Sequence, residues 1–225
     1  MRKGKRLLCL ILSLLLLFPM STSALAADFS SVEDFQDSQD FIGEGPYSWC
    51  YSEFQTLIQN KVIFGDSANL LPGRKLSRAE FLAMMLRLGV QSGILDQSAI
   101  TPSGKGHFVD VRPESWYWKS VNWAAENGLA YGVSADRFDP NGTVTFQEME
   151  CFLYRFVEKY HVDLGEPTRF VDYVDIAPWA LRSVQFFGER QIWLNYPQLF
   201  SHKDFATRAD AVFLIARAAQ LGNLL

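Results

Sequence analysis

The chain has 225 residues, of which 48% are hydrophobic and 20% charged, a composition that excludes wholesale disorder and collagen-like or other low-complexity architectures. The formal net charge of −4 understates the acidity of most of the chain, because Arg2, Lys3, Lys5 and Arg6 all stand in the first 26 residues, which contain no acid. This acidity disfavours general nucleic-acid binding and adhesion to anionic lipid, both of which require clustered Lys and Arg.

The first residues, 1–26, have the build of a secretory signal. A basic start is followed by an apolar run over 7–18 and by the small-residue sequence Ala-Leu-Ala at 24–26. We expect export and cleavage after this sequence, since the apolar run is shorter than the roughly 20 residues that span a bilayer. No membrane span is expected in the mature protein. Export permits disulfides, but Cys50 and Cys151 are expected to be buried free thiols.

Three segments of the chain align with one another, which predicts a repeat architecture. In each copy an aromatic residue stands two positions before an Asp, a Trp follows, and a Gly or Asn lies sixteen positions after the Trp. A Ser or Thr comes 28 or 29 positions after the Trp, with an acid three residues later. In copy order these residues are Phe35, Phe108 and Phe170; Asp37, Asp110 and Asp172; Trp49, Trp116 and Trp179; Gly65, Gly132 and Asn195; Ser77, Thr145 and Thr207; Glu80, Glu148 and Asp210.

The pattern of apolar residues indicates two helices in each copy. The first helix follows the Trp and is predicted to end near Asn60, Asn127 and Arg190. The second follows the Ser or Thr, where apolar residues recur at i, i+3, i+4 and i+7. One such unit cannot bury its apolar stripe alone, so we expect a single mainly helical domain in which the copies pack together. The predicted organisation is a signal peptide at 1–26, repeat 1 at 27–89, repeat 2 at 90–157 and repeat 3 at 158–225, the last two each with a preceding linker.

The second copy carries residues that resemble a known family. The segments 108–110, 120–129, 138–140 and 145–148, together with Trp116, resemble the S-layer homology repeat, and three copies cover nearly the whole mature chain. The resemblance implies an all-α fold, with three helix–loop–helix repeats packed as a pseudo-threefold spindle. It also implies noncovalent attachment to the bacterial cell wall or cell surface. The implied partner is a peptidoglycan-linked secondary cell-wall polysaccharide, often with a pyruvylated sugar that carries a carboxylate.

The family's signature Thr-Arg-Ala-Glu is matched at 77–80 and 207–210. Its Ser or Thr and its acid form a capping box at the start of the second helix. Its arginine, here Arg78 or Arg208, is less easily explained, because the helix dipole disfavours a cation in the first turn. Two interpretations stay open: the arginine and free helix amides bind an anionic ligand, or the arginine pairs with a neighbouring acid. The resemblance favours the ligand.

The three copies differ at the positions that this interpretation needs. Copy two has Phe146 in place of the arginine, and copy three has Asn195 in place of the glycine, whose backbone could approach a ligand. Only copy one holds both Gly65 and Arg78, so we predict one good groove there and a weaker one at Arg208. The candidate ligand-binding residues are Arg78, Gly65, Ser77, Arg208, Thr207, Gly132 and Trp116.

The other recurring residues are interpreted mainly as structural. Trp49, Trp116 and Trp179 are expected to form core between the copies, although Trp116 is kept as a candidate for stacking on a sugar. Trp118 and Trp123 have no aromatic counterpart in copy one and are expected to be more exposed. Backbone and helix-dipole interactions are expected for Asp37, Asp110 and Asp172 and for Arg87, Arg155 and Arg217.

No constellation for catalysis or metal binding stands out. His107, His161 and His202 are scattered, and neither a phosphate-binding loop nor a nucleophile elbow occurs. We therefore expect no enzyme activity, no catalytic residue, no metal and no cofactor. The alternative to a wall anchor is a module for surface assembly that contacts other surface-layer proteins without binding glycan, and the degenerate second copy keeps it open.

Overall fold

The structure is a computed structural model that describes residues 29–100, 106–168 and 176–225. The expected leader at 1–26 and the opening motif of copy three at 170–172 lie outside these ranges. Within them the chain forms helices and isolated bridges but no strand, so the predicted all-α fold class is confirmed. The α-helices are α1 (Tyr51–Gln59), α2 (Arg78–Gln91), α3 (Trp118–Glu126), α4 (Phe146–Lys159), α5 (Leu181–Glu189) and α6 (Arg208–Leu221). Short 3-10 helices are η1 (Val32–Asp34), η2 (Ser38–Phe41), η3 (Ser48–Cys50) and η4 (Gln97–Ala99).

Local sequence signals set the ends of these helices. Helices α2, α4 and α6 each begin after the predicted Ser or Thr, and all three carry a complete capping box. Helices α1, α3 and α5 end at the predicted C-caps, Asn60, Asn127 and Arg190. In the first two copies the recurring Asp binds backbone amides, as expected. The Asp37 carboxylate accepts hydrogen bonds from the amides of Leu70 and Leu71. The Asp110 carboxylate accepts them from the amides of Phe138 and Asp139.

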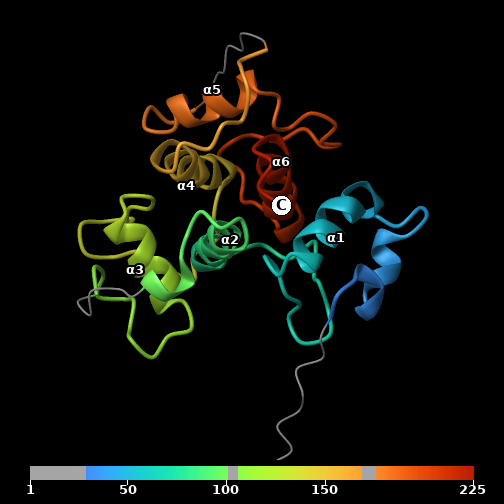
Figure 1. The fold of residues 1–225 in the computed structure, drawn as a ribbon, viewed down its shortest axis with the longest axis horizontal. Helices are drawn as coiled ribbons and strands as arrows, with labels where there is room; N and C mark the ends of the chain where they lie inside the picture. Colours follow the sequence, from blue (N-terminus) through green and yellow to red (C-terminus); the bar gives the residue numbers. More distant parts are fainter. Residues whose placement is uncertain (1–28, 101–105, 169–175) are drawn as a thin grey trace, which may run out of the picture.

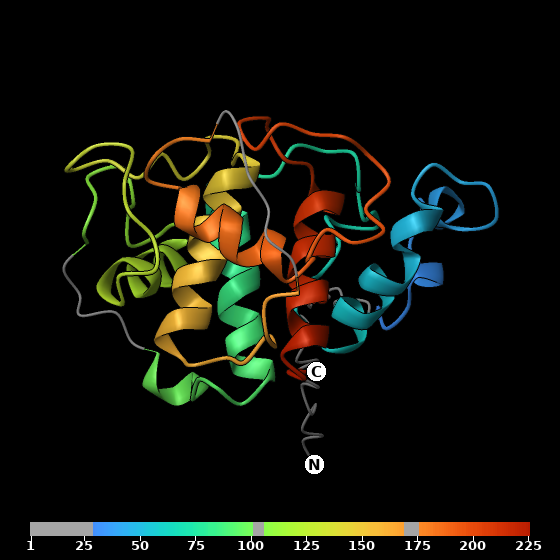
Figure 2. The same cartoon turned by 90° about the horizontal axis from the view of Figure 1, so that it is seen from above.

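The six α-helices form two concentric sets around a pseudo-threefold axis. The inner helices α2, α4 and α6 lie around the axis, with α1, α3 and α5 outside them (Figure 1). Seen from above, the inner helices run side by side (Figure 2). Each outer helix packs on the inner helix of the preceding copy, α3 on α2 and α5 on α4, and α1 of copy one packs on α6 of copy three. The three copies therefore close into a ring.

A cycle of three backbone hydrogen bonds joins the copies just before the inner helices begin. The amide of Leu76 donates to the carbonyl of Ala206 at 3.0 Å, Ala206 to Val144 at 2.9 Å, and Val144 back to Leu76 at 3.0 Å. All three residues are fully buried. A buried backbone group without a hydrogen-bond partner is costly. Each copy therefore depends on both of the others for the hydrogen bonds of its buried amide and carbonyl at this point.

The core lies between the inner helices and extends outward to each outer helix. Its largest side chains include Phe54, Phe81, Phe156 and Phe187, and full burial of such a side chain contributes roughly 1.5–3 kcal/mol. Both cysteines of the described part are free and buried, as expected. None of the helices in the described ranges has the length and apolar character needed to cross a membrane.

Candidate ligand-binding grooves

The N-termini of the inner helices do not offer the free amides that we expected from the sequence. In α2 the amide of Arg78 donates to the carbonyl of Gly142 at 2.9 Å, and that of Ala79 to Pro140 at 3.0 Å. Loops of the neighbouring copy cap α4 and α6 in the same way. The hydroxyls of Ser77 and Thr207 are engaged in their capping boxes. An anion in these grooves must therefore be held by side chains.

The first residue of each inner helix points into the next copy around the ring. Arg78 of copy one contacts the carbonyls of Tyr131 and Phe138 in copy two. Arg208 of copy three contacts the carbonyl of Phe64 in copy one. The glycine and the arginine of one groove thus come from different copies, which corrects the prediction that Gly65 and Arg78 share a groove.

Groove 1 lies over α2 and takes residues from all three copies. It is a hollow of about 280 Å³, lined by Phe64, Gly65, Asp66, Arg74, Glu80, Ala83, Met84, Arg87, Trp116 and Arg208. The arginine predicted to mark the weaker groove is therefore placed beside Gly65 and Trp116. Three guanidinium groups line this groove.

Arg208 is the most deeply buried cation of groove 1, with only 6% of its surface exposed. Its Nη2 donates to the Phe64 carbonyl, and its buried Nε has no acceptor among the described residues. Burial lowers the pKa of Arg208 to about 10, with Arg74 and Arg87 acting in the same direction and Glu80 against it. The side chain therefore retains hydrogen-bonding capacity in a site that disfavours its own charge.

Groove 2 is the equivalent hollow over α4, of about 440 Å³, lined by Arg78, Tyr131, Gly132, Val133, Glu148, Cys151, Phe152, Arg155 and Trp179. Arg78, 4% exposed, donates from Nε to the Phe138 carbonyl at 3.0 Å, from Nη2 to Tyr131 at 2.9 Å and from Nη1 to the Glu148 carboxylate. Burial lowers the pKa of Arg78, while Glu148 opposes this. Pairing with a protein acid, the second interpretation open from sequence, describes Arg78 in this structure.

The two recurring glycines make room for their own loops. A Cβ atom on Gly65 would lie 2.3 Å from a ring carbon of Phe35, and one on Gly132 would lie 2.3 Å from the carbonyl oxygen of Arg137. Both distances are far below van der Waals contact. The glycines therefore allow the loop at the edge of each groove to pack closely against other residues of the same copy. Their expected role in approaching a ligand stays a prediction.

The tryptophans that precede the outer helices were wrongly expected to form core in copies two and three. Trp116 is 62% exposed in groove 1, and Trp179 is 55% exposed in groove 2. Trp123, expected to be more exposed, is one of the buried residues of α3. Exposed aromatic faces beside Phe64 and Tyr131, which are themselves exposed, give each groove a surface on which a sugar ring can stack.

The third equivalent position is closed by aromatic side chains. Phe146, at the position of the arginine, stacks on Phe200 with ring centroids 4.0 Å apart and also contacts Trp193. The indole of Trp193 donates to the fully buried Glu150 at 2.8 Å, and His202 Nδ1 lies 2.8 Å from the same carboxylate. Phe146 is thus occupied by aromatic contacts, and the absence of anion binding at this position stays a prediction. This aromatic cluster could not be predicted from the sequence, because Trp193 and Phe200 stand in a loop without apolar periodicity.

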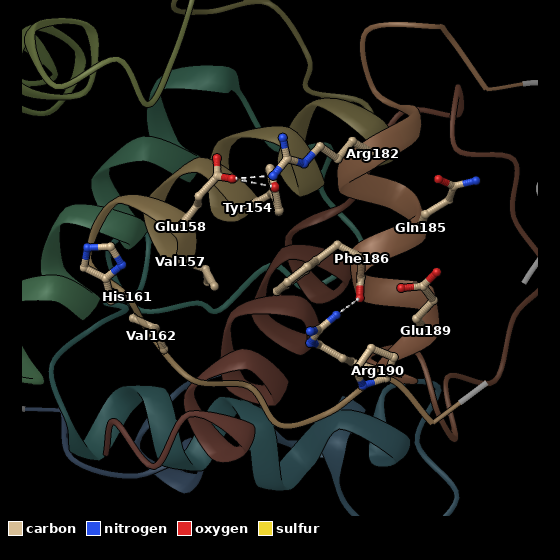
Figure 3. Close-up of a pocket in the computed structure, with 11 residues that line it drawn as sticks. Tyr154, Val157, Glu158, His161, Val162, Arg182, Gln185, Phe186, Glu189 and Arg190 are labelled. Atoms are coloured by element: carbon tan, nitrogen blue, oxygen red, sulfur yellow. Dashed lines mark hydrogen bonds and ion pairs between the residues drawn. The ribbon is translucent and has the colours of Figure 1, made fainter. Parts of the chain in front are cut away.

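A further hollow of about 570 Å³ lies between α4 and α5 and contains none of the predicted site residues (Figure 3). Both of its arginines bind within the protein: Arg182 donates to Glu158 at 2.7 Å, as Tyr154 does at 2.8 Å, and Arg190 donates to the Phe186 carbonyl at 3.2 Å. We therefore place the candidate site in grooves 1 and 2. In the described ranges no group of three His, Cys, Asp or Glu side chains is arranged to hold a metal.

Comparison with known proteins finds similarity to the same family that the sequence resembles. The model of the S-layer homology domain matches residues 45–82 and 107–150, which belong to copies one and two. An amylopullulanase of Thermoanaerobacterium thermosulfurigenes is 27% identical over 194 residues, 84% of this chain and 10% of the enzyme. The surface-layer 125 kDa protein of Lysinibacillus sphaericus is 31% identical over 128 residues, 56% of this chain and 10% of that protein. A cell surface protein of Thermoanaerobacter kivui is 28% identical over 156 residues, 69% of this chain and 19% of that protein.

The chain spans only a tenth to a fifth of the length of these relatives. The similarity to the amylopullulanase is confined to a tenth of that enzyme, and it therefore assigns no catalytic activity to this chain. The similarity of this chain is to the S-layer homology domain, which is a non-catalytic module.

Proposed function

We propose that this chain is a noncovalent anchoring module that binds an anionic secondary cell-wall polysaccharide, with a pyruvylated sugar as the candidate ligand. The observation that carries the proposal is the combination, in grooves 1 and 2, of a buried guanidinium with exposed aromatic rings. Aromatic faces stack on sugar rings, and a guanidinium fork matches a carboxylate. The protein would act at the cell surface after export, without nucleic acid or a membrane as partner.

The comparisons support the surface role. Two segments match the S-layer homology domain, and the matched relatives include a surface-layer protein and a cell surface protein. In groove 1 the proposed ligand contacts are Arg208, Gly65 and Trp116, and in groove 2 Arg78 and Gly132. Ser77 and Thr207, which the sequence also predicts as ligand contacts, use their hydroxyls to cap α2 and α6.

Sedimentation with isolated cell walls tests the proposal. The purified chain should sediment with walls that retain their secondary polysaccharide and stay in the supernatant after this polymer is stripped off. Arg208→Ala should weaken binding about tenfold or more, because a charge-assisted hydrogen-bond donor is lost. Arg182→Ala removes the same charge away from both grooves and should bind as the parent does. Equal sedimentation with intact and stripped walls would contradict the proposal.

The alternative, a surface assembly module that binds other surface-layer proteins, is favoured by one observation. Leu194, Leu199 and Phe205 are exposed in the loop between α5 and α6, the same loop that supplies Trp193 and Phe200 to the closed third position. Exposed apolar side chains, where they form a contiguous patch, are typical of protein interfaces. Retention of the chain on immobilised surface-layer protein, lost on Leu199→Glu, together with no preference for intact walls, would favour this alternative.

A further inference from the structure

Grooves 1 and 2 are equivalent in position but differ in what their buried arginine already binds. In groove 2, Arg78 uses Nε, Nη1 and Nη2 on acceptors of the protein, one of them the Glu148 carboxylate. In groove 1, Arg208 has no carboxylate within ion-pair distance among the described residues, and its Nε lacks an acceptor. Of the two buried arginines that begin an inner helix, Arg208 is therefore the one with donors left for a ligand.

The difference originates at Arg74. Glu80 occupies in copy one the position that Glu148 occupies in copy two, so it could have paired with Arg208. Instead its carboxylate accepts two hydrogen bonds from Arg74, at 2.6 Å from Nη2 and 3.2 Å from Nη1. The positions equivalent to Arg74 are Gly142 in copy two and Asp204 in copy three. Only copy one therefore has a cation there to occupy its capping acid.

Arg87 adds a third guanidinium to groove 1. Its Nη1 donates to the Val62 carbonyl at 3.4 Å and its guanidinium lies 5.0 Å from the centre of the Phe64 ring, with no carboxylate in ion-pair distance in the described part of the chain. The acids that line the groove are Glu80, held by Arg74, and Asp66, which is exposed at the rim. Two of the three guanidinium groups of groove 1 are thus without an acidic partner, against one of two in groove 2, where Arg155 donates to the Leu129 carbonyl at 3.3 Å and has no ion pair among the described residues.

We propose that the two grooves take different ligand groups, groove 1 an anionic group such as a sugar carboxylate and groove 2 an uncharged sugar, and that Arg74 is the residue that sets this difference. The inference rests on the proposed glycan-binding function. A carboxylate entering groove 1 meets the open donors of Arg208 and displaces no protein acid. In groove 2 it must displace Glu148 from Arg78 or lie beside it, and a like charge at that distance is unfavourable.

The exposed tryptophans make the two grooves separately observable. The whole chain is labelled with 5-fluorotryptophan, and the fluorine signals of the two grooves are assigned with Trp116→Phe and Trp179→Phe. It is then titrated with methyl glucuronide, which carries a carboxylate, and with the uncharged methyl glucoside. The variant is Arg74→Gln, and the matched control is Lys75→Gln, which removes an exposed cation that lies over Phe205 and does not line groove 1.

We expect the Trp116 signal to report a dissociation constant for methyl glucuronide about tenfold or more below that for methyl glucoside, and the Trp179 signal to show no such preference. Arg74→Gln should release Glu80 to Arg208 and abolish the preference at Trp116, whereas Lys75→Gln should retain it. Equal charge preference in both grooves, a preference that survives Arg74→Gln, or no response of Trp116 to the glucuronide would overturn the inference. Wall sedimentation tests the proposed function separately. If the chain binds walls but the Trp116 signal shows no charge preference, only the inference is rejected. If Trp116 shows the preference but the chain does not bind walls, only the proposed function is rejected.

Discussion

Replacing Arg78 by Ala should strongly lower the free energy of unfolding, because this side chain joins copy one to copy two. The substitution leaves the carbonyls of Tyr131 and Phe138 without this donor and removes the ion pair of Glu148, whose carboxylate keeps only the hydrogen bonds from Thr145. Removing one partner of a buried ion pair costs about 3–5 kcal/mol. The Glu148 side chain is 23% exposed, so water can partly replace the arginine. The free energy of unfolding should therefore fall by about 3 kcal/mol. The gain from removing a cation at a helix N-terminus, about 0.3–1 kcal/mol, does not offset this loss.

Urea unfolding followed by far-UV circular dichroism measures this change at neutral pH. The matched control is Arg182→Ala, which breaks the ion pair between Arg182 and Glu158, whose side chains are 77% and 51% exposed. An exposed pair contributes about 0–1 kcal/mol, so the control should unfold almost as the parent does. If Arg78→Ala loses no more stability than Arg182→Ala, the role of Arg78 as a link between copies is refuted.

Four further outcomes are expected. Phe146→Ala should lower the free energy of unfolding by about 3–5 kcal/mol in urea titrations, since it leaves a cavity in the closed third position, and should leave wall binding of the folded variant unchanged. Burial raises the pKa of Asp110, but the two backbone amides that bind it outweigh this and hold its pKa below the ordinary value. The parent should therefore be more stable than Asp110→Asn at neutral pH, and this difference should disappear as the pH falls below about 4. Urea midpoints measured across pH test this. Burial raises the pKa of Cys50 and Cys151, so a thiol reagent should label neither before unfolding and both afterwards. Deleting 170–225 removes the helix on which α1 packs, and the remainder should lose its cooperative thermal transition, whereas a sharp transition in the truncated chain would contradict the closed ring.

The features that could be predicted from the sequence are those encoded locally. The capping boxes at Ser77, Thr145 and Thr207 need only a hydroxyl and an acid three residues later, and they occur where the sequence places them. The ends of the outer helices at Asn60 and Asn127 follow from the same kind of short-range pattern. Because each signal is contained within one helical turn, packing between copies does not alter it.

The composition of the grooves could not be predicted, because it depends on contacts between copies. An alignment of the copies groups Gly65 with Arg78, because both belong to copy one. Closure of the ring instead places Gly65 beside Arg208 of copy three. The exposure of Trp116 has the same origin: it precedes the outer helix of copy two but lies against the inner helix of copy one. An alignment of copies shows which positions are equivalent and is silent about which copy supplies the neighbour.

The shift by one copy also changes what the irregular residues mean for function. Taken copy by copy, Phe146 removes the arginine of copy two and Asn195 removes the glycine of copy three, which suggests that two grooves are damaged. In the ring, Phe146 points into copy three, where it packs on Trp193 and Phe200, so both departures fall on the same position in space. They remove one groove rather than two. The two other positions each retain a glycine and a buried arginine, which explains how a chain with only two matches to the family's signature can still present two complete grooves.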